Sequence, residues 1–402
     1  MMKICFRNIL RISAFVPLHI LASLLLAGVP CISWAQTTPT AYFAGVAFTG
    51  NHSDIATEFP HLSRVIDAAT NHRISTQIRE QWQTKPHPIN LLFGQLGDTQ
   101  DAERSTALAL AIDRETTSIE RIGNVYKVRL EISMQLLFFD FKEKQVLGGF
   151  PVILDYIDAT PTSPTDEQIQ SDFEGMVLGT KGQHSLAGEF VGALTHISIP
   201  NPSTRHLRVT SVVLEPKAIA YLQKYKPAAD PEIIRRQIAQ EFGKYLAANQ
   251  HLSILPFASN QALGKNMAAS FANGDSFNLT IPDADYDISL DVAGFKKIEV
   301  GRTNTSVGYL YGAFVDLTVK EPLSGKIYFS QRIKQGASEN VPVTEADMDD
   351  WTASYDTLRL LFNNFTLALS DPEGKWVGSA LPPGSNSRAQ LSSLSELVKS
   401  CR

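Results

Sequence analysis

One serine of this chain has surroundings that partly match the nucleophile turn of a serine hydrolase. That turn needs small residues two positions before and two positions after the serine, because its backbone is strained and crowded. Gln183 stands two positions before Ser185, so the match is incomplete. Asp230 and His251 follow in the sequence and complete a triad only if the fold brings them to Ser185. A secreted serine hydrolase using Ser185 is therefore an alternative, and no catalytic residue is assigned.

Four aspartates are spaced in part like the oxygen ligands of a calcium loop. They are Asp283, Asp285, Asp287 and Asp291. A calcium loop requires glycine directly after its third ligand, where this chain has Ile288. Apolar and polar residues then alternate, as they do along a half-buried strand. The four acids are therefore predicted to form a solvent-facing row on a strand.

The remaining polar and glycine patterns predict no metal or cofactor site. Eight of the nine histidines follow residue 35, and no two of them have the four-residue spacing of a helical metal site. Gly301, Gly308 and Gly312 are too far apart to enclose a phosphate. Asp155 and Asp158 are interpreted as the polar end of a strand, not as an acid pair.

The first 35 residues have the three regions of a secretory signal peptide. Lys3, Arg7 and Arg11 form a basic start, and an apolar run follows over residues 18–29. This run is shorter than the ~20 residues that a membrane span needs. Cleavage is predicted directly after Ala35, which places the protein in the periplasm or outside the cell.

Cysteine usage limits the ways in which the exported chain is held together. Cys401 is the only cysteine after residue 35, so no internal disulfide can form. Val29 and Pro30 precede Cys31, where a lipid-anchor site needs a small residue, so lipidation is not expected.

Composition excludes one class of partner. Three of the 36 Lys and Arg residues lie within residues 1–35 and none of the 41 Asp and Glu residues do, which leaves 33 positive against 41 negative charges, or −8. Nucleic-acid binding requires clustered basic residues and is not expected. The hydrophobic fraction of 44% is typical of a globular chain with a core. No second long apolar stretch predicts a transmembrane span.

The expected elements occur in the same order in both halves. Each half has a first strand, a helix that is strongly amphipathic at residues 231–249, and three long β segments joined by short turns. Helices then start near Thr165 and Pro342, the second ending near Leu369. The expected strands are residues 42–48, 107–119, 125–140 and 145–156 in the first half, and residues 207–214, 252–257, 287–300, 307–320 and 326–333 in the second.

Two local matches predict an internal duplication. The turn at residues 140–146 aligns with residues 321–327 at an offset of 181, and the helix start at Pro164 aligns with Pro342 at an offset of 178. The predicted fold class is α/β (α+β), with two related domains that each have a mixed sheet, a three-stranded antiparallel meander and helices on one face. The predicted parts are a signal peptide (1–35), a first domain (36–183), a linker (184–205), a second domain (206–370), and a linker with a short amphipathic helix (371–402).

The second half also carries a pattern known from bacterial envelope proteins. Asp285-Tyr286 enters a strand, a later strand ends at Glu321, and Ser324-Gly325-Lys326 turns into a return strand. Residues 205–370 thereby resemble the periplasmic α/β domain of the curli secretion channel, the amino-terminal domain of the Tol-system propeller protein, and the lipoprotein activators of peptidoglycan synthases. The chain lacks their lipid-anchor cysteine, channel hairpins and propeller repeats. The resemblance implies a protein-contacting envelope module without catalytic residues.

Two apolar features are candidate contact surfaces. Phe138 and Phe139 are consecutive on one expected strand, so they must point to opposite faces of its sheet. The second face is either an exposed aromatic strip for a partner, together with Phe141, or a face covered by the other repeat. Leu391 and Leu394 lie on one side of the last helix, which docks either on its own domain or in a partner.

These observations favour a non-enzymatic envelope accessory or assembly protein that acts through contacts with an unidentified envelope or outer-membrane protein. The alternatives are the serine hydrolase using Ser185 and a periplasmic protein that binds a small ligand.

Overall fold

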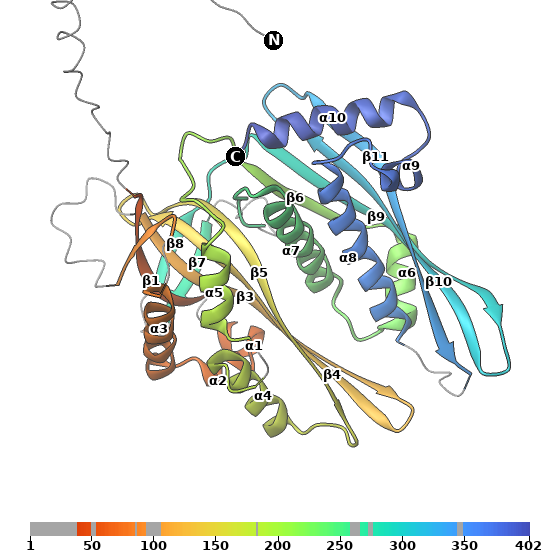
Figure 1. Ribbon diagram of the computed structural model, residues 1–402, viewed down its shortest axis with the longest axis horizontal. Helices are drawn as coiled ribbons and strands as arrows, with labels where there is room; N and C mark the ends of the chain where they lie inside the picture. Colours follow the sequence, from red (N-terminus) through yellow and green to blue (C-terminus); the bar gives the residue numbers. More distant parts are fainter. Residues whose placement is uncertain are drawn as a thin grey trace, which may run out of the picture. The chain divides into compact units, whose positions relative to one another are not determined.

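The computed structural model describes residues 38–49, 54–84, 87–93, 106–181, 184–257, 266–271, 276–343 and 349–402. Residues 39–402 form one compact unit. The predicted signal peptide and its cleavage site after Ala35 lie outside the described residues. The predicted mixed α/β class with two sheet-bearing regions is confirmed (Figure 1).

Two sheets contain all the named strands. The first has the order β2-β1-β3-β4-β5-β8-β7, and β7 pairs again with β1; the second has the order β11-β10-β9-β6. The strands of the first sheet are β1 (Thr40–Thr49), β2 (Asn90–Leu92), β3 (Thr106–Ile122), β4 (Val125–Asp140), β5 (Gln145–Thr160), β7 (Asn266–Phe271) and β8 (Ser276–Thr280). The strands of the second are β6 (Leu207–Leu214), β9 (Tyr286–Arg302), β10 (Ser306–Lys320) and β11 (Ile327–Pro342).

Several helices begin where the sequence supplies a side-chain cap. Thr165 and Gln168 form a capping box at the start of α4, and Asp230 accepts the Glu232 N–H at the start of α7. The helices are α1 (Ile55–Glu58), α2 (Leu62–Val65), α3 (Ala68–Trp82), α4 (Asp166–Leu178), α5 (Leu186–Leu194), α6 (Pro216–Tyr225), α7 (Pro231–Gln250), α8 (Asp350–Ala368), α9 (Lys375–Ala380) and α10 (Ser385–Lys399). None of the helices in the described residues is long and apolar enough to cross a membrane.

The two sheets share one topology. In each, a first strand pairs in parallel with the first strand of an antiparallel meander, giving β1-β3-β4-β5 and β6-β9-β10-β11. The register shifts at Phe138/Phe139 in one meander and at Val319/Lys320 in the other. These irregularities are 181 residues apart, which is the offset between the two turns in the sequence. The shared topology and register support a duplicated unit.

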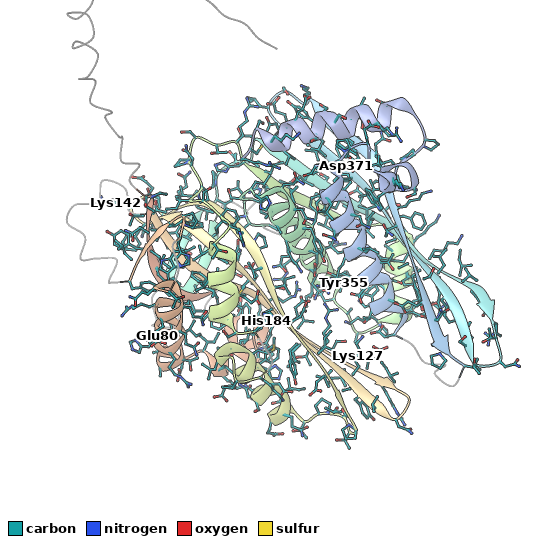
Figure 2. All side chains as sticks on the ribbon, viewed as in Figure 1. Glu80, Lys127, Lys142, His184, Tyr355 and Asp371 are labelled. Atoms are coloured by element: carbon teal, nitrogen blue, oxygen red, sulfur yellow. The ribbon has the colours of Figure 1, made fainter. Side chains whose placement is uncertain are left out.

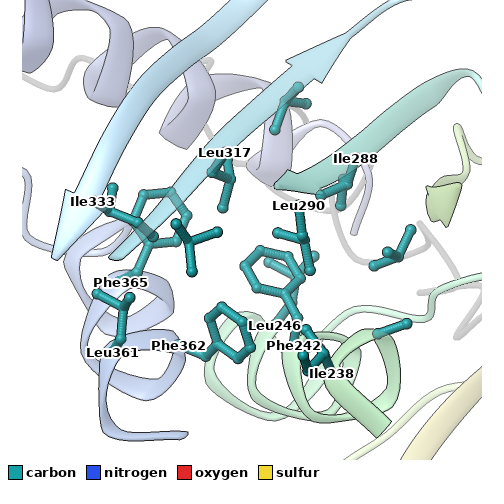
Figure 3. Packing of buried hydrophobic residues seen from close by; sticks show 14 of the residues in the cluster. Ile238, Phe242, Leu246, Ile288, Leu290, Leu317, Ile333, Leu361, Phe362 and Phe365 are labelled. Atoms are coloured by element: carbon teal, nitrogen blue, oxygen red, sulfur yellow. The ribbon is translucent and has the colours of Figure 1, made fainter. Parts of the chain in front are cut away.

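Each sheet buries one face under helices. Apolar residues of α3, α4 and α5 form one core with β1, β3, β4 and β5. Residues of α6, α7, α8 and α10 form a second core with β6, β9, β10 and β11. Figure 3 shows Phe242 and Leu246 of α7 and Phe362 and Phe365 of α8 against Leu290 and neighbouring strand residues. These helices therefore provide the closest apolar cover of the second sheet.

The second face of the first sheet is covered as well, so no aromatic strip is exposed there. Phe138 lies in the helix-covered core and Phe139 in a separate cluster, and both are fully buried. The cover includes Leu255, Leu279 and Ile281, which come from the second half of the sequence. The boundary predicted at residues 184–205 thus does not separate the sheets, because β7 and β8 of the second half pair with β1 and β5.

Several predicted elements differ at their ends. Pro342 ends β11 and opens no helix; α8 starts after Asp349, whose side chain accepts the N–H groups of Trp351 and Thr352. Residues 344–347, part of the predicted helix start, lie outside the described residues. Residues 252–257 contain only isolated bridges at Ile254 and Leu255, and the predicted linker 371–388 contains α9 and the start of α10.

Candidate functional site

A charged contact joins the second face of the first sheet to the helices that cover the second sheet. Arg114 of β3 donates to Glu131 Oε1 (2.6 Å) and Ser133 Oγ (3.0 Å) on β4, and to Gln240 Oε1 (2.5 Å) on α7. Burial opposes the charge of Glu131, but Arg114 and Arg129 hold the pKa of its carboxyl below the ordinary value. The contact therefore keeps a buried carboxylate charged.

Two further arginines extend this contact across α8. Arg129 of β4 lies 3.4 Å from carboxylate oxygens of both Glu131 and Asp155, and 3.5 Å from Asp356 Oδ1 on α8. Arg359 of α8 lies 3.7 Å from Asp155 Oδ2 and 3.9 Å from Glu131 Oε2. Both arginines thus bind carboxylates from the sheet and from the helix, which balances the buried charges.

Glu241 is the least satisfied member of this contact. Its side chain is 1% exposed, and Arg359 Nε lies 3.2 Å from Oε1 without hydrogen-bond geometry. Burial raises the pKa of Glu241 to about 7, although Lys244 nearby favours the charged form. The Tyr355 hydroxyl is also without a hydrogen-bond partner among the described residues; Figure 2 marks its position on α8. A polar pocket of about 60 Å³ lies here, which is enough for bound water.

The corresponding face of the second sheet has different residues. Gly312 of β10 lies opposite Lys296 of β9 and Gly336 of β11, where the first sheet has Glu131 opposite Thr116 and Asp155. Leu310 stands where Arg129 stands in the first repeat, again 181 residues earlier. Glycine and leucine therefore replace the charged residues that bind α7 and α8 in the first repeat.

These glycines form the floor of a hollow of about 340 Å³. Leu310, Phe314, Ile298, Lys296 and Lys334 line it, together with Ser379 of α9. We call the face that carries these residues and the two glycines the open face. Ile298 is 39% exposed, and neither lysine has an ion-pair partner in the part of the chain that the structure describes.

The open face combines features of a contact surface. Strand β10 has apolar residues on both faces, with Val315 and Leu317 buried under helices and Leu310 and Phe314 on the open face. A strand that is apolar on both faces is typical of a sheet covered on both sides. Within the described ranges, α6, α7, α8 and α10 contribute to the core on the opposite face, and the only helical residue that lines the hollow is Ser379 of α9. The open face is therefore our candidate functional site.

The structure does not bring the predicted serine-hydrolase residues together. Ser185 caps α5, and its Oγ accepts the Gly188 N–H at 3.0 Å. Asp230 and His251 flank opposite ends of the 20-residue helix α7. A helix of that length spans about 30 Å, so the two residues cannot belong to one triad. Gln183 lies outside the described residues.

The predicted acidic row lies at the start of β9. Asp287 and Asp291 are half-buried strand residues, and Asp285 precedes the strand and accepts the His206 N–H at 2.7 Å. Burial raises the pKa of both Asp287 and Asp291. Asp155, which was interpreted with Asp158 as the polar end of a strand, belongs to the charged contact, which sequence reasoning missed.

The other candidate groups serve the structure. Among the described residues, no three His, Cys, Asp or Glu side chains are placed to hold a metal ion. Cys401 is buried, and burial raises the pKa of its thiol to about 11. Asp158 accepts from the Tyr156 hydroxyl at 3.0 Å. Gly301, Gly308 and Gly312 lie within strands β9 and β10.

In comparisons with known proteins, similarities were found to solved structures only. No protein-family model matches the sequence, and no curated protein matches it significantly. A minor lipoprotein from Acinetobacter baumannii is 11% identical, with a TM-score of 0.20 over 45% of this chain and 98% of that one. A neuraminyllactose-binding hemagglutinin homolog from Helicobacter pylori is 12% identical, with a TM-score of 0.22 over 42% of this chain and 86% of that one. A Xanthomonas campestris protein of the DUF330 family is 12% identical, with a TM-score of 0.21 and the same coverage.

At these TM-scores, the similarities assign no function to this chain.

Proposed function

We propose that this chain is a non-enzymatic accessory protein of the bacterial envelope that acts through protein–protein contacts on its open face. The basic start and short apolar run of residues 1–35 support export. N-terminal sequencing of the protein from the periplasm tests this part: the expected first residue is Gln36, and an intact Met1 would contradict export.

One observation carries the proposed contact. Glu131 and its neighbours in the first repeat bind α7 and α8, whereas the hollow around Gly312 in the second repeat is lined by Ser379 of α9 and by no other residue of the described helices. Glycine in a strand allows close approach of another backbone. Exposed apolar residues rimmed by charge are typical of a protein contact. The expected partner surface is a helix that carries carboxylates for Lys296 and Lys334.

In-cell photocrosslinking tests the contact. A benzoylphenylalanine at Ile298 is expected to form an adduct with protein, whereas the same probe at Leu323, which is 99% exposed in the turn after β10, is not. Lys296→Glu with Lys334→Glu is expected to remove the adduct, because both changes place negative charge against the partner's carboxylates.

A matched charge change provides the control. Lys224→Glu with Lys399→Glu alters two exposed lysines outside the open face and is expected to keep the adduct. Equal adducts from both probe positions, or none from Ile298, would contradict the proposal. A small molecule that copurifies and is released by Gly336→Leu, without any protein adduct, would favour a ligand-binding protein instead.

A further inference from the structure

We propose that the partner on the open face is a second copy of this chain, which binds through the exposed side of α4. This inference rests on the proposed function, because it names the partner of the same surface. The two copies associate head to tail, with the second sheet of one against the helical layer of the other.

The helices and sheets are stacked in an order that leaves a helical surface at one end of the stack and a sheet surface at the other. Helices α3, α4 and α5 pack on the first sheet, the charged contact joins that sheet to α7 and α8, and these helices pack on the second sheet (Figure 1). A helical layer thus lies at one end and the open face at the other. A second copy placed head to tail continues the same alternation of helices and sheets.

The internal contact supplies a template for this association. There, Arg129 of the sheet binds Asp356 of α8, so this ion pair takes its cation from the sheet and its carboxylate from the helix, whereas Arg359 of α8 pairs in the opposite sense with sheet carboxylates. Helix α4 follows the first meander as α8 follows the second. On the open face the cations are Lys296 and Lys334, and carboxylates are again required from the helix.

Helix α4 presents the required groups on one exposed side. Glu167, Ser171 and Glu174 are all exposed and follow a spacing of four and three residues, which places them on one helix face. The two glutamates are about 10 Å apart along the axis, given a rise of about 1.5 Å per residue. The small Ser171 between them allows the helix to approach the glycine floor of the hollow.

The lysines have a matching separation. Lys296 of β9 pairs with Gly312 of β10, which in turn pairs with Gly336 of β11, so Lys296 and Gly336 are two strands apart. Lys334 lies two residues before Gly336 on β11. Strand spacing and rise per residue place the two lysine Cα atoms about 12 Å apart. Helix α4 of a second copy, lying diagonally across the strands, can therefore pair each glutamate with one lysine while Ser171 faces the glycines.

Charge exchange between the two surfaces tests the inference. Analytical ultracentrifugation of the purified protein is expected to show mass that rises with concentration and falls with added salt, since head-to-tail contacts need not close. The sheet variant (Lys296→Glu, Lys334→Glu) and the helix variant (Glu167→Lys, Glu174→Lys) are each expected to be monomeric. An equal mixture is expected to associate again, because each variant then presents the charge that the other lacks.

Each outcome decides the matter. Thermal melting first establishes that both variants fold, which their exposed positions favour. Restored association in the mixture supports the contact, and continued association of either variant alone, or a mixture that stays monomeric, overturns it. Wild-type protein that stays monomeric while the Ile298 probe labels a different protein overturns the second-copy partner but leaves the proposed function intact. A monomer with no adduct overturns both.

Discussion

Gly312 of β10 and Gly336 of β11 lie directly opposite each other, at the positions that Glu131 and Asp155 occupy in the first repeat. In the first repeat, this pair of positions binds arginines and is covered by α7 and α8. In the second, it forms the floor of a hollow that no residue of α7 or α8 lines. The two meanders therefore share a backbone register, while the side chains at these positions differ.

A side chain placed at Gly336 fills the hollow, and its effects on association and on stability can be measured separately. Glycine in a strand costs about 0.5–1 kcal/mol relative to a residue with a side chain. A Cβ atom at Gly336 would lie 3.4 Å from Leu310 Cδ1, which can move. We expect Gly336→Thr to raise the free energy of unfolding in urea by up to about 1 kcal/mol and to abolish association.

Gly301→Thr is the matched control, because nothing lies within 4 Å of a Cβ atom at that position of β9. It is expected to give a similar gain in stability and normal association. Loss of association in both variants, or in neither, would show that the hollow is not the contact.

Glu241 makes stability depend on pH in a defined direction. Its pKa rises from 4.5 to about 7 on folding, so the folded protein binds the proton more tightly than the unfolded chain does. The free energy of unfolding therefore falls as pH rises from about 4.5 through about 7. The full pKa difference corresponds to about 3 kcal/mol. We expect urea unfolding at pH 5 and pH 8 to differ less in Glu241→Gln than in the wild type.

Burial raises the pKa of Asp113 to about 6, so Asp113 also makes the protein less stable as the pH rises. Asp113 is present in both the wild type and Glu241→Gln, so it does not cause a difference between them. Glu232→Gln removes an exposed carboxylate from the same helix and should retain the wild-type pH dependence. If Glu241→Gln also retains it, the carboxyl of Glu241 does not titrate in this range.

The architecture was predictable because local patterns determine it. Turn residues and alternating β segments located both meanders, and the bounds of β4 and β6 agree with the predicted ones. The start of α8 was predicted wrongly, because Pro342 resembles a first helical residue but continues β11 to its end. Asp349, which caps α8, follows a segment outside the described residues.

The candidate site was not predictable, because strand register creates it. Lys296, Gly312 and Gly336 become neighbours only when three strands pair, and alternation alone does not give the register. The charged contact has the same cause, since Arg114 and Gln240 are 126 residues apart. The apolar residues on both faces of β10 were the one available signal.

Phe139 tests whether the second face of the first sheet is truly covered. It is 1% exposed and packs in a cluster with Leu137 and Leu279. Removing a buried phenylalanine side chain leaves a cavity, and Phe139→Ala is expected to lower the free energy of unfolding by about 3–5 kcal/mol. Ile157→Ala, at a β5 residue that is 59% exposed, should change it by no more than about 0.5 kcal/mol. Similar small effects of both changes would mean that the face is open.

His61 connects three elements of the first repeat. Its Nδ1 lies 2.8 Å from Glu115 Oε1 on β3, and its Nε2 lies 3.0 Å from Asp166 Oδ1 at the start of α4. The Glu115 side chain is only 4% exposed, so losing the imidazole leaves a buried carboxylate with fewer partners. A hydrogen bond to a charged group contributes about 1.5–3 kcal/mol, and His61→Ala should lower the free energy of unfolding by about 2 kcal/mol.

His72→Ala removes an exposed histidine from α3 and should have little effect, so the difference between the two variants in urea unfolding measures the contacts of His61. Because His61 fixes the first turn of α4, His61→Ala should also weaken head-to-tail association, whereas His72→Ala should not. Equal stability and equal association of the two variants would show that the start of α4 is held by its Thr165 capping box alone.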